Sequence, residues 1–156
     1  MGAKSNTNPF AVAELTLAQE IRSSTEISGI FDGEPVSVFA ACEEDLSGKI
    51  RRAIARGVGQ CVCVRTESAE AAERESGGLR AKVRLVVEVT ANGATASQRR
   101  KSTSDLAFAI VAALDGALFE PPFTEMPVLW TGSDVYDDGV LYGVALRFEA
   151  NILLKN

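Results

Sequence analysis

The sequence predicts an α+β fold: a two-layer sandwich of a mainly antiparallel sheet with helices packed on one face, closed by a long C-terminal β-hairpin. Three observations indicate this class. Residues 79–91 alternate apolar and polar side chains, residues 106–114 carry no charge, and residues 140–154 alternate again after an Asp-Asp-Gly turn. Alternation with a period of two is typical of a half-buried strand, whereas an uncharged run behind capping residues is typical of a buried helix.

The other elements follow from local signals along the chain. Asn8 and Pro9 are the residue types that cap and begin a helix. An Asp-Gly reversal at 32–33 predicts either a short hairpin or a single strand after a loop, and Gly57 is suited to end a helix. The expected order begins with a helix over 9–23, one or two short strands among 27–31 and 36–41, a helix over 43–56 and a strand over 58–66. A polar loop over 67–78, a strand over 79–91 and a polar basic loop over 92–102 follow. A helix over 104–119 and strands over 128–136 and 140–154 complete the chain.

Two of these elements carry more apolar or extended surface than a small domain covers. The helix over 104–119 is apolar around most of its circumference, so we expect the sheet to cover one side and another helix or a neighbouring subunit to cover the rest. The final strand is much longer than the usual ~5–6 residues, so part of it should protrude or serve in assembly. Its predicted apolar face consists of Tyr142, Val144, Leu146, Phe148, Ala150 and Ile152.

Composition limits the classes of function. The chain of 156 residues is the length of one domain, and we expect a flexible N-terminus over 1–8 and a single α+β domain over 9–156. Histidine is absent, which removes His-dependent catalytic triads and His zinc ligation. The net charge of −5 disfavours a general nucleic-acid binder. Since no apolar run approaches the ~18 residues of a membrane span, we expect no membrane partner.

The cysteines do not predict a redox or metal site. Cys61 and Cys63 lie two apart in an expected strand, and with Cys42 they match neither a C-x-x-C motif nor a paired zinc knuckle. We interpret all three as small, buried or half-buried hydrophobic residues with reduced thiols, in keeping with synthesis in the cytoplasm. We therefore assign no metal and no cofactor.

Acidic residues offer the main route to an enzyme, and the sequence favours a simpler interpretation. The cluster of Asp134, Asp137 and Asp138 has the ligand type for a divalent cation, but a solvated hairpin tip is favoured. A carboxylate-dependent enzyme would draw on residues such as Glu88 or Asp134. No residue is assigned a catalytic role, and the expected answer is that the chain is not an enzyme.

A basic triplet and two aromatic residues are the candidate contact residues. Arg99, Arg100 and Lys101 form the one concentrated basic patch, which is either a solvated loop or a contact to an acidic partner surface or to DNA passing nearby. Phe123 and Trp130 flank a Pro-rich connection, where aromatic residues either close the core or anchor an interface. These five residues are the predicted subunit or partner interface.

The order of elements resembles a known family. An N-terminal helix, a strand-rich middle, a helix after a long strand and a closing hairpin, seen here in 79–91, 104–119 and 128–154, resemble the tail terminator (tail completion) proteins of tailed bacteriophages and the related neck and minor tail proteins. The closing strand reads YGVALRFEANILL from Tyr142 to Leu154. That family has no diagnostic short motif, so no residue role is transferred.

The resemblance implies a structural virion protein of the tail or neck, made in the host cytoplasm. Copies would form a ring, usually a hexamer, that caps the tail tube and joins it to the head-side connector, with DNA only as passing cargo. The alternatives from other classes are a small α+β ligand-binding or regulatory module and the carboxylate-dependent enzyme.

Overall fold

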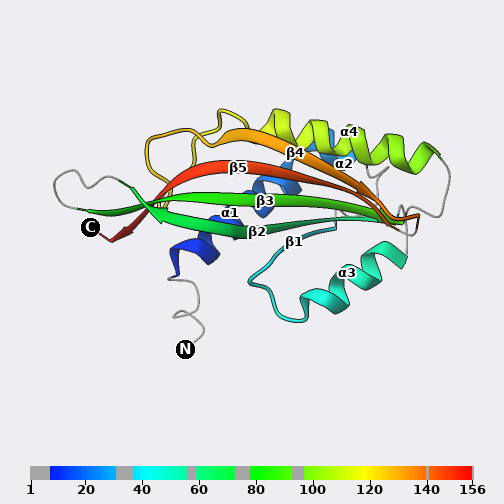
Figure 1. Cartoon of the computed structure of the whole chain (residues 1–156), viewed down its shortest axis with the longest axis horizontal. Helices are drawn as coiled ribbons and strands as arrows, with labels where there is room; N and C mark the ends of the chain where they lie inside the picture. Colours follow the sequence, from blue (N-terminus) through cyan, green and yellow to red (C-terminus); the bar gives the residue numbers. More distant parts are fainter. Residues whose placement is uncertain are drawn as a thin grey trace.

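The computed structural model describes residues 8–30, 37–55, 59–72, 78–92, 97–139 and 141–155, with the backbone alone at 92, 97–100 and 102. The expected flexible segment over 1–8 falls outside these residues except for Asn8. The elements, drawn in Figure 1, are α1 (Pro9–Ser23), α2 (Thr25–Ile30), β1 (Val38–Ala40), α3 (Leu46–Ala55), β2 (Gln60–Ala71), β3 (Leu79–Asn92), α4 (Ser97–Leu114), β4 (Leu129–Asp137) and β5 (Leu141–Lys155).

The strands form one five-stranded sheet in the order β1-β2-β3-β5-β4. β1 pairs with β2 in parallel, and the other three pairings are antiparallel. β3 and β5 pair along their whole lengths, which makes the sheet long and narrow (Figure 1). β4 and β5 form the closing hairpin. The predicted α+β class, the mainly antiparallel sheet and the C-terminal hairpin are therefore confirmed.

The main core lies between one face of the sheet and three helices. α1 packs against β1, β2 and β5, α4 packs against β3 and β5, and α2 packs against α4. Phe148 and Leu146 point into this core and are 0% and 2% exposed. Each such side chain contributes about 1.5–3 kcal/mol through burial. The predicted apolar face of the last strand is confirmed, with Tyr142 half-buried at its start.

A buried carboxylate ties α1 to the sheet. Glu14 is only 7% exposed, and its Oε2 accepts hydrogen bonds from the backbone N–H of Thr66 at 2.8 Å and from the Thr66 hydroxyl at 2.9 Å. The register of β2 against β3 shifts between Thr66 and Ser68. A β-bulge leaves backbone groups without a ladder partner, and the Glu14 side chain supplies an acceptor at that point.

α3 covers the opposite face at the β1 side of the sheet. Along β2, Val62 and Val64 belong to the main core, whereas Cys61 and Cys63 alternate with them and are nevertheless buried. α3 packs against β1, β2 and β3 and buries Ala53 there. Figure 1 shows α3 on the near side of the sheet and α1 and α2 behind it. The β1 side of the sheet is therefore covered on both faces. The face that the sequence predicts to carry the helices holds α1, α2 and α4, and α3 is the exception.

Of the two alternatives for this region, the hairpin is wrong, because residues 25–30 form the helix α2, and the single strand is present as β1. The Ser24 hydroxyl accepts a hydrogen bond from the backbone N–H of Ile27 at 3.3 Å, as a helix cap does. Ile27 is the buried residue of this helix, so a single apolar side chain anchors α2 in the core. The Asp-Gly reversal lies outside the described residues, and the expected strand over 36–41 is present as β1.

Three other predicted bounds move for physical reasons. The helix expected from residue 43 begins at Leu46, since Asp45 has a positive φ of 52° and cannot lie within a helix. The loop expected over 67–78 begins as a strand, because β2 continues to pair with β3 as far as Ala71 opposite Ala81. α4 ends at Leu114 rather than residue 119, where Gly116 adopts a φ of 79° that favours glycine.

Candidate assembly surface

β4 is an edge strand whose outer side has no strand partner among the described residues. Every one of its positions is exposed except the half-buried Gly132. Val135 is 63% exposed and Trp130 is 44% exposed. They pair with Val144 and Phe148, so their side chains lie on the helix-bearing face of the sheet. An open edge with apolar side chains is a template for association with another chain.

α4 lies beside this edge and leaves its own outer side uncovered. Near its C-terminal end, the Asp115 carboxylate accepts a hydrogen bond from the backbone N–H of Trp130 at 2.9 Å. Near its start, the hydroxyls of Ser104 and Tyr142 are 3.3 Å apart. Between these contacts stands Phe108, whose side chain is 75% exposed.

We define the α4–β4 surface as Phe108, Ala112, Trp130 and Val135, which are all exposed. The prediction that this helix is buried on more than one side is met in part. The sheet, α1 and α2 cover the side that carries Leu106, Ala107, Ile110 and Leu114. The side that carries Phe108 remains open, so an uncovered apolar surface persists in the isolated chain.

The opposite edge of the sheet is closed by side chains. Arg22 donates from Nε to the backbone carbonyl of Val38 at 3.1 Å, and Glu43 Oε2 accepts from the backbone N–H of Ala40 at 2.5 Å. Burial by itself raises the pKa of Glu43, but the Ala40 hydrogen bond, Lys49 and Arg22 outweigh it and hold that pKa below 4.5. β1 therefore offers little free backbone to another strand, unlike β4.

A hollow of about 510 Å³ lies where the connection from α4 to β4 crosses the ends of β3 and β5. Its apolar wall includes Leu118 and Met126, which are 66% and 56% exposed. Phe123 also lines the hollow, but it is only 5% exposed and its ring packs on Phe119 with centroids 5.2 Å apart. The structure thus places Phe123 in the core and leaves Trp130 at the surface.

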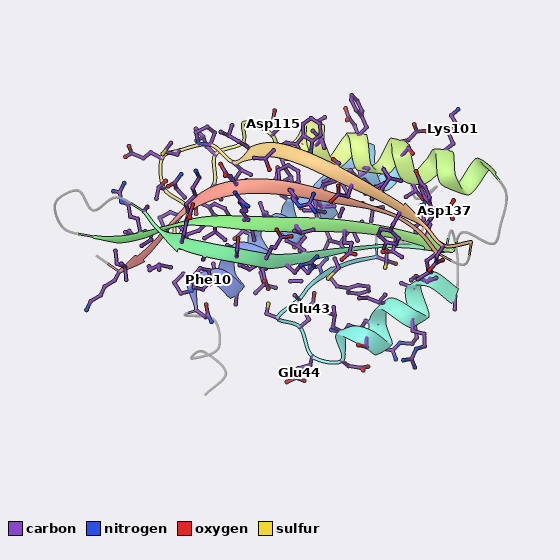
Figure 2. The ribbon with its side chains drawn as sticks, in the orientation of Figure 1. Phe10, Glu43, Glu44, Lys101, Asp115 and Asp137 are labelled. Carbon is purple, nitrogen blue, oxygen red and sulfur yellow. The ribbon has the colours of Figure 1, made fainter. Side chains whose placement is uncertain are left out.

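The basic triplet does not lie in a loop, because α4 begins at Ser97 and includes it. Lys101 is exposed, and the side chains of Arg99 and Arg100 lie outside the described part of the structure. Figure 2 shows Lys101 toward the end of the molecule where Asp137 lies. Trp130 lies instead by Asp115, beyond the C-terminal end of the same helix. The structure therefore separates the triplet from Trp130.

The acidic candidates are engaged in structural contacts. Asp134 forms an ion pair with Arg147, and Glu88 is 3.5 Å from the Arg65 guanidinium. Asp137 Oδ1 accepts from the backbone N–H of Gly139 at 3.0 Å, as expected of a hairpin tip. Among the described residues, no group of three or more His, Cys, Asp or Glu side chains is placed to hold a metal ion.

Neither the two buried thiols nor the helices add a candidate reactive site or membrane span in the described part of the chain. Burial, with Cys63 and Glu88 nearby, raises the pKa of the Cys61 thiol to about 12. Burial and Glu88 likewise raise the pKa of Cys63 to about 11, so both thiols behave as apolar side chains. Cys42 is exposed. In the described part of the chain, no helix has the length and apolar character needed to cross a bilayer.

Sequence reasoning did not single out four exposed apolar residues: Phe108, Leu118, Met126 and Val135. The uncharged run over 106–114 did indicate surplus apolar surface. Which side chain of that run stays uncovered depends on how α4 sits on the sheet, and the pattern alone does not specify this.

The fold and surface together define a class: a small α+β protein with one closed sheet edge and one open edge beside exposed apolar side chains. Among solved structures, the chain is similar to a protein chain described as "Virion of native gene transfer agent (GTA) particle". The TM-score is 0.60 with 16% sequence identity, over 92% of this chain and 97% of that chain. At this identity the likeness shows the fold alone. No protein-family model matches the sequence. No curated protein matches it in sequence either.

Proposed function

We propose that this chain is a structural subunit of a phage-like particle and has no enzymatic role. The observation that carries the proposal is the α4–β4 surface, where Phe108, Trp130 and Val135 stay exposed beside an unpaired strand edge. Exposed apolar side chains beside an open strand edge are typical of an assembly interface. The origin of the similar fold in a gene transfer agent virion supports the same class of function.

In the more specific form of the proposal, the chain is a tail terminator. It forms a hexameric ring that caps the tail tube and joins it to the head-side connector, and it resides in the tail or neck of the virion. Its partners are other copies of itself, tail tube proteins and connector proteins. The resemblance in element order supports this role, and the residues proposed for contacts are Arg99, Arg100, Lys101, Trp130 and, as a wall of the hollow, Phe123.

DNA enters the proposal only as cargo. The net charge is −5, and a protein of this charge repels phosphates more than it holds them. A channel through such a ring would let DNA slide without retention.

The proposal is tested by measuring molecular mass across a wide concentration range, using light scattering and sedimentation velocity, and by imaging the largest species with an electron microscope. We expect concentration-dependent growth into rings for the wild type. Phe108→Asp should shift the chain to monomer without loss of helical circular dichroism. Gln19→Glu, which adds a charge at an exposed position of α1, serves as the control. A wild type that stays monomeric at every concentration contradicts the proposal.

The hollow supports a second candidate function, a small-ligand binding module. Its volume of about 510 Å³ falls within the ~300–1,000 Å³ of ligand pockets, and its wall is mostly apolar. A thermal-stability screen of small apolar compounds distinguishes the two functions. Stabilisation of a monomer by such a compound, abolished by Leu118→Glu and unaffected by Phe108→Asp, would favour the ligand module.

A further inference from the structure

The chain carries both an exposed apolar knob and an unfilled apolar hollow, at different places on its surface. Phe108 stands on the outer side of α4 and is 75% exposed. The hollow lies beyond the end of that helix, between the α4–β4 connection and the ends of β3 and β5. Because Phe108 is so exposed, it does not fill the hollow of its own chain.

We propose that a second copy of this chain occupies the hollow and that the residue it inserts is Phe108. This inference rests on the proposed assembly function and names the residues on each side of one contact. An aromatic ring in an apolar pocket is the usual form of an interface hot spot. The volume of about 510 Å³ accommodates such a ring, and the exposed Leu118 and the intrinsically flexible Met126 in its wall can pack around it.

The charges around Phe108 are complementary to those around the hollow. On α4, Asp105 and Lys101 are exposed and precede Phe108 by one and two helical turns. Around the hollow, Arg80 and Glu125 are exposed and contribute to its wall. Ion pairing does not join any of these four side chains to another group within the described part of the chain. Asp105 facing Arg80 and Lys101 facing Glu125 would give two opposite-charge pairs across the contact, which favours one orientation of the second copy.

The contact is directional, and this has a consequence for assembly. Each copy gives its Phe108 to one neighbour and receives the Phe108 of another, so the two surfaces in contact differ. Contacts of this kind build rings when the rotation closes and filaments when it does not. Trp130 and Val135 lie on the α4–β4 surface with Phe108 and would extend the buried area around the anchor.

The test mixes two variants that each lack one half of the contact. Phe108→Asp removes the knob and leaves the hollow intact, whereas Leu118→Glu places a charge in the hollow and leaves the knob intact. Both sites are exposed, so both variants should fold, and circular dichroism with thermal melting checks this. Each variant alone should associate at least about tenfold more weakly than the wild type. An equimolar mixture should form a heterodimer and nothing larger, because only one complete contact remains.

Trapping by a disulfide gives a second, independent readout. In a Cys42→Ser background, Ala112→Cys, which keeps Phe108 and lies one helical turn after it, is mixed with Leu118→Cys under mild oxidation, and covalent heterodimers are expected. Gln19→Cys replaces Ala112→Cys in the control mixture and should give none. If the wild type assembles but the Asp and Glu variants assemble equally well, or if their mixture stays monomeric and no crosslink forms, this inference is overturned and the proposed function stands. A wild type that never assembles overturns both.

Discussion

The ring of Tyr136 lies directly over Gly143, its cross-strand partner on β5. A β-carbon at residue 143 would collide with the Tyr136 ring, so this glycine provides the space that the ring occupies. The Tyr136 hydroxyl reaches across β5 to within 3.2 Å of the Thr90 hydroxyl on β3. One aromatic side chain thus fastens the edge strand β4 to the middle of the sheet.

Gly143→Ala is expected to displace the Tyr136 ring and to break its contact with Thr90, which should destabilise the fold by about 1 kcal/mol, since the ring is 37% exposed and can swing outward. Urea unfolding followed by circular dichroism measures this change. Gly29→Ala is the control for an added methyl group, since its β-carbon would meet nothing within 4 Å, and within the helix α2 it should raise stability by up to about 1 kcal/mol. A wild-type midpoint for Gly143→Ala would show that the contact between Tyr136 and Gly143 does not hold β4.

Leu146→Asp and Phe148→Asp are expected to unfold the chain. Their side chains are 2% and 0% exposed, and burying an unpaired carboxylate costs several kcal/mol. Thr131→Asp, at an exposed position of the neighbouring strand, should leave the thermal midpoint within about a degree or two. A cooperative thermal transition in either core variant would show that the predicted face of β5 is not buried in solution.

Glu43 predicts a pH dependence of stability. Its folded pKa is held below 4.5 by Ala40, Lys49 and Arg22 despite burial, so the unfolded chain takes up its proton first. Glu43 therefore contributes stability above about pH 4.5, and this contribution is lost as the pH falls through the lowered pKa.

Glu43→Gln should accordingly lower the midpoint of urea unfolding at neutral pH, and its difference from the wild type should shrink as the pH falls below 4.5. The neighbouring Glu44 is exposed and lies outward on the same loop (Figure 2). Glu44→Gln is therefore the control, with little effect at neutral pH. A Glu43→Gln deficit that is constant from neutral to acidic pH would rule out the carboxylate as the cap of β1.

Replacing Arg99, Arg100 and Lys101 together by Ser is expected to keep the fold and weaken association. Cations in the first turns of a helix oppose its dipole, so their loss should leave the thermal midpoint unchanged or slightly higher. Sedimentation velocity compares the self-association of this variant with that of the wild type. The charge-matched control carries Ser at three exposed basic positions elsewhere, Arg51, Arg84 and Lys155. Equal assembly of all three proteins would remove the triplet from the interface.

Much of the fold was predictable because its strongest signals are local and repeated. The long alternation over residues 79–91 and 140–154 specified β3, β5 and the face of β5 that carries Phe148. The caps Asn8 and Pro9 placed α1 at its observed bounds. Weaker local signals were misleading at residues 27–31, where a Ser24 cap and one buried isoleucine produce the helix α2 in place of a strand.

The candidate site was less predictable than the fold. Trp130 and Phe123 looked alike as aromatic residues beside a Pro-rich connection. Trp130 stays exposed because it lies on an edge strand, whereas Phe123 is buried because its segment bridges to Ile152 on β5. The basic triplet was expected in a loop but lies in the helix α4, because α4 begins at Ser97, well before its run of apolar residues.

By itself, the sequence determined the class of fold, the closing hairpin and an excess of apolar surface, because periodicity and composition act over neighbouring residues. Only the tertiary structure decided where that excess lies: β4 became the open edge and Phe108 was left uncovered, while Arg22 and Glu43 closed the other edge. The physical reason is that exposure depends on which elements pack against each other across the sheet, and those contacts join residues far apart in the chain.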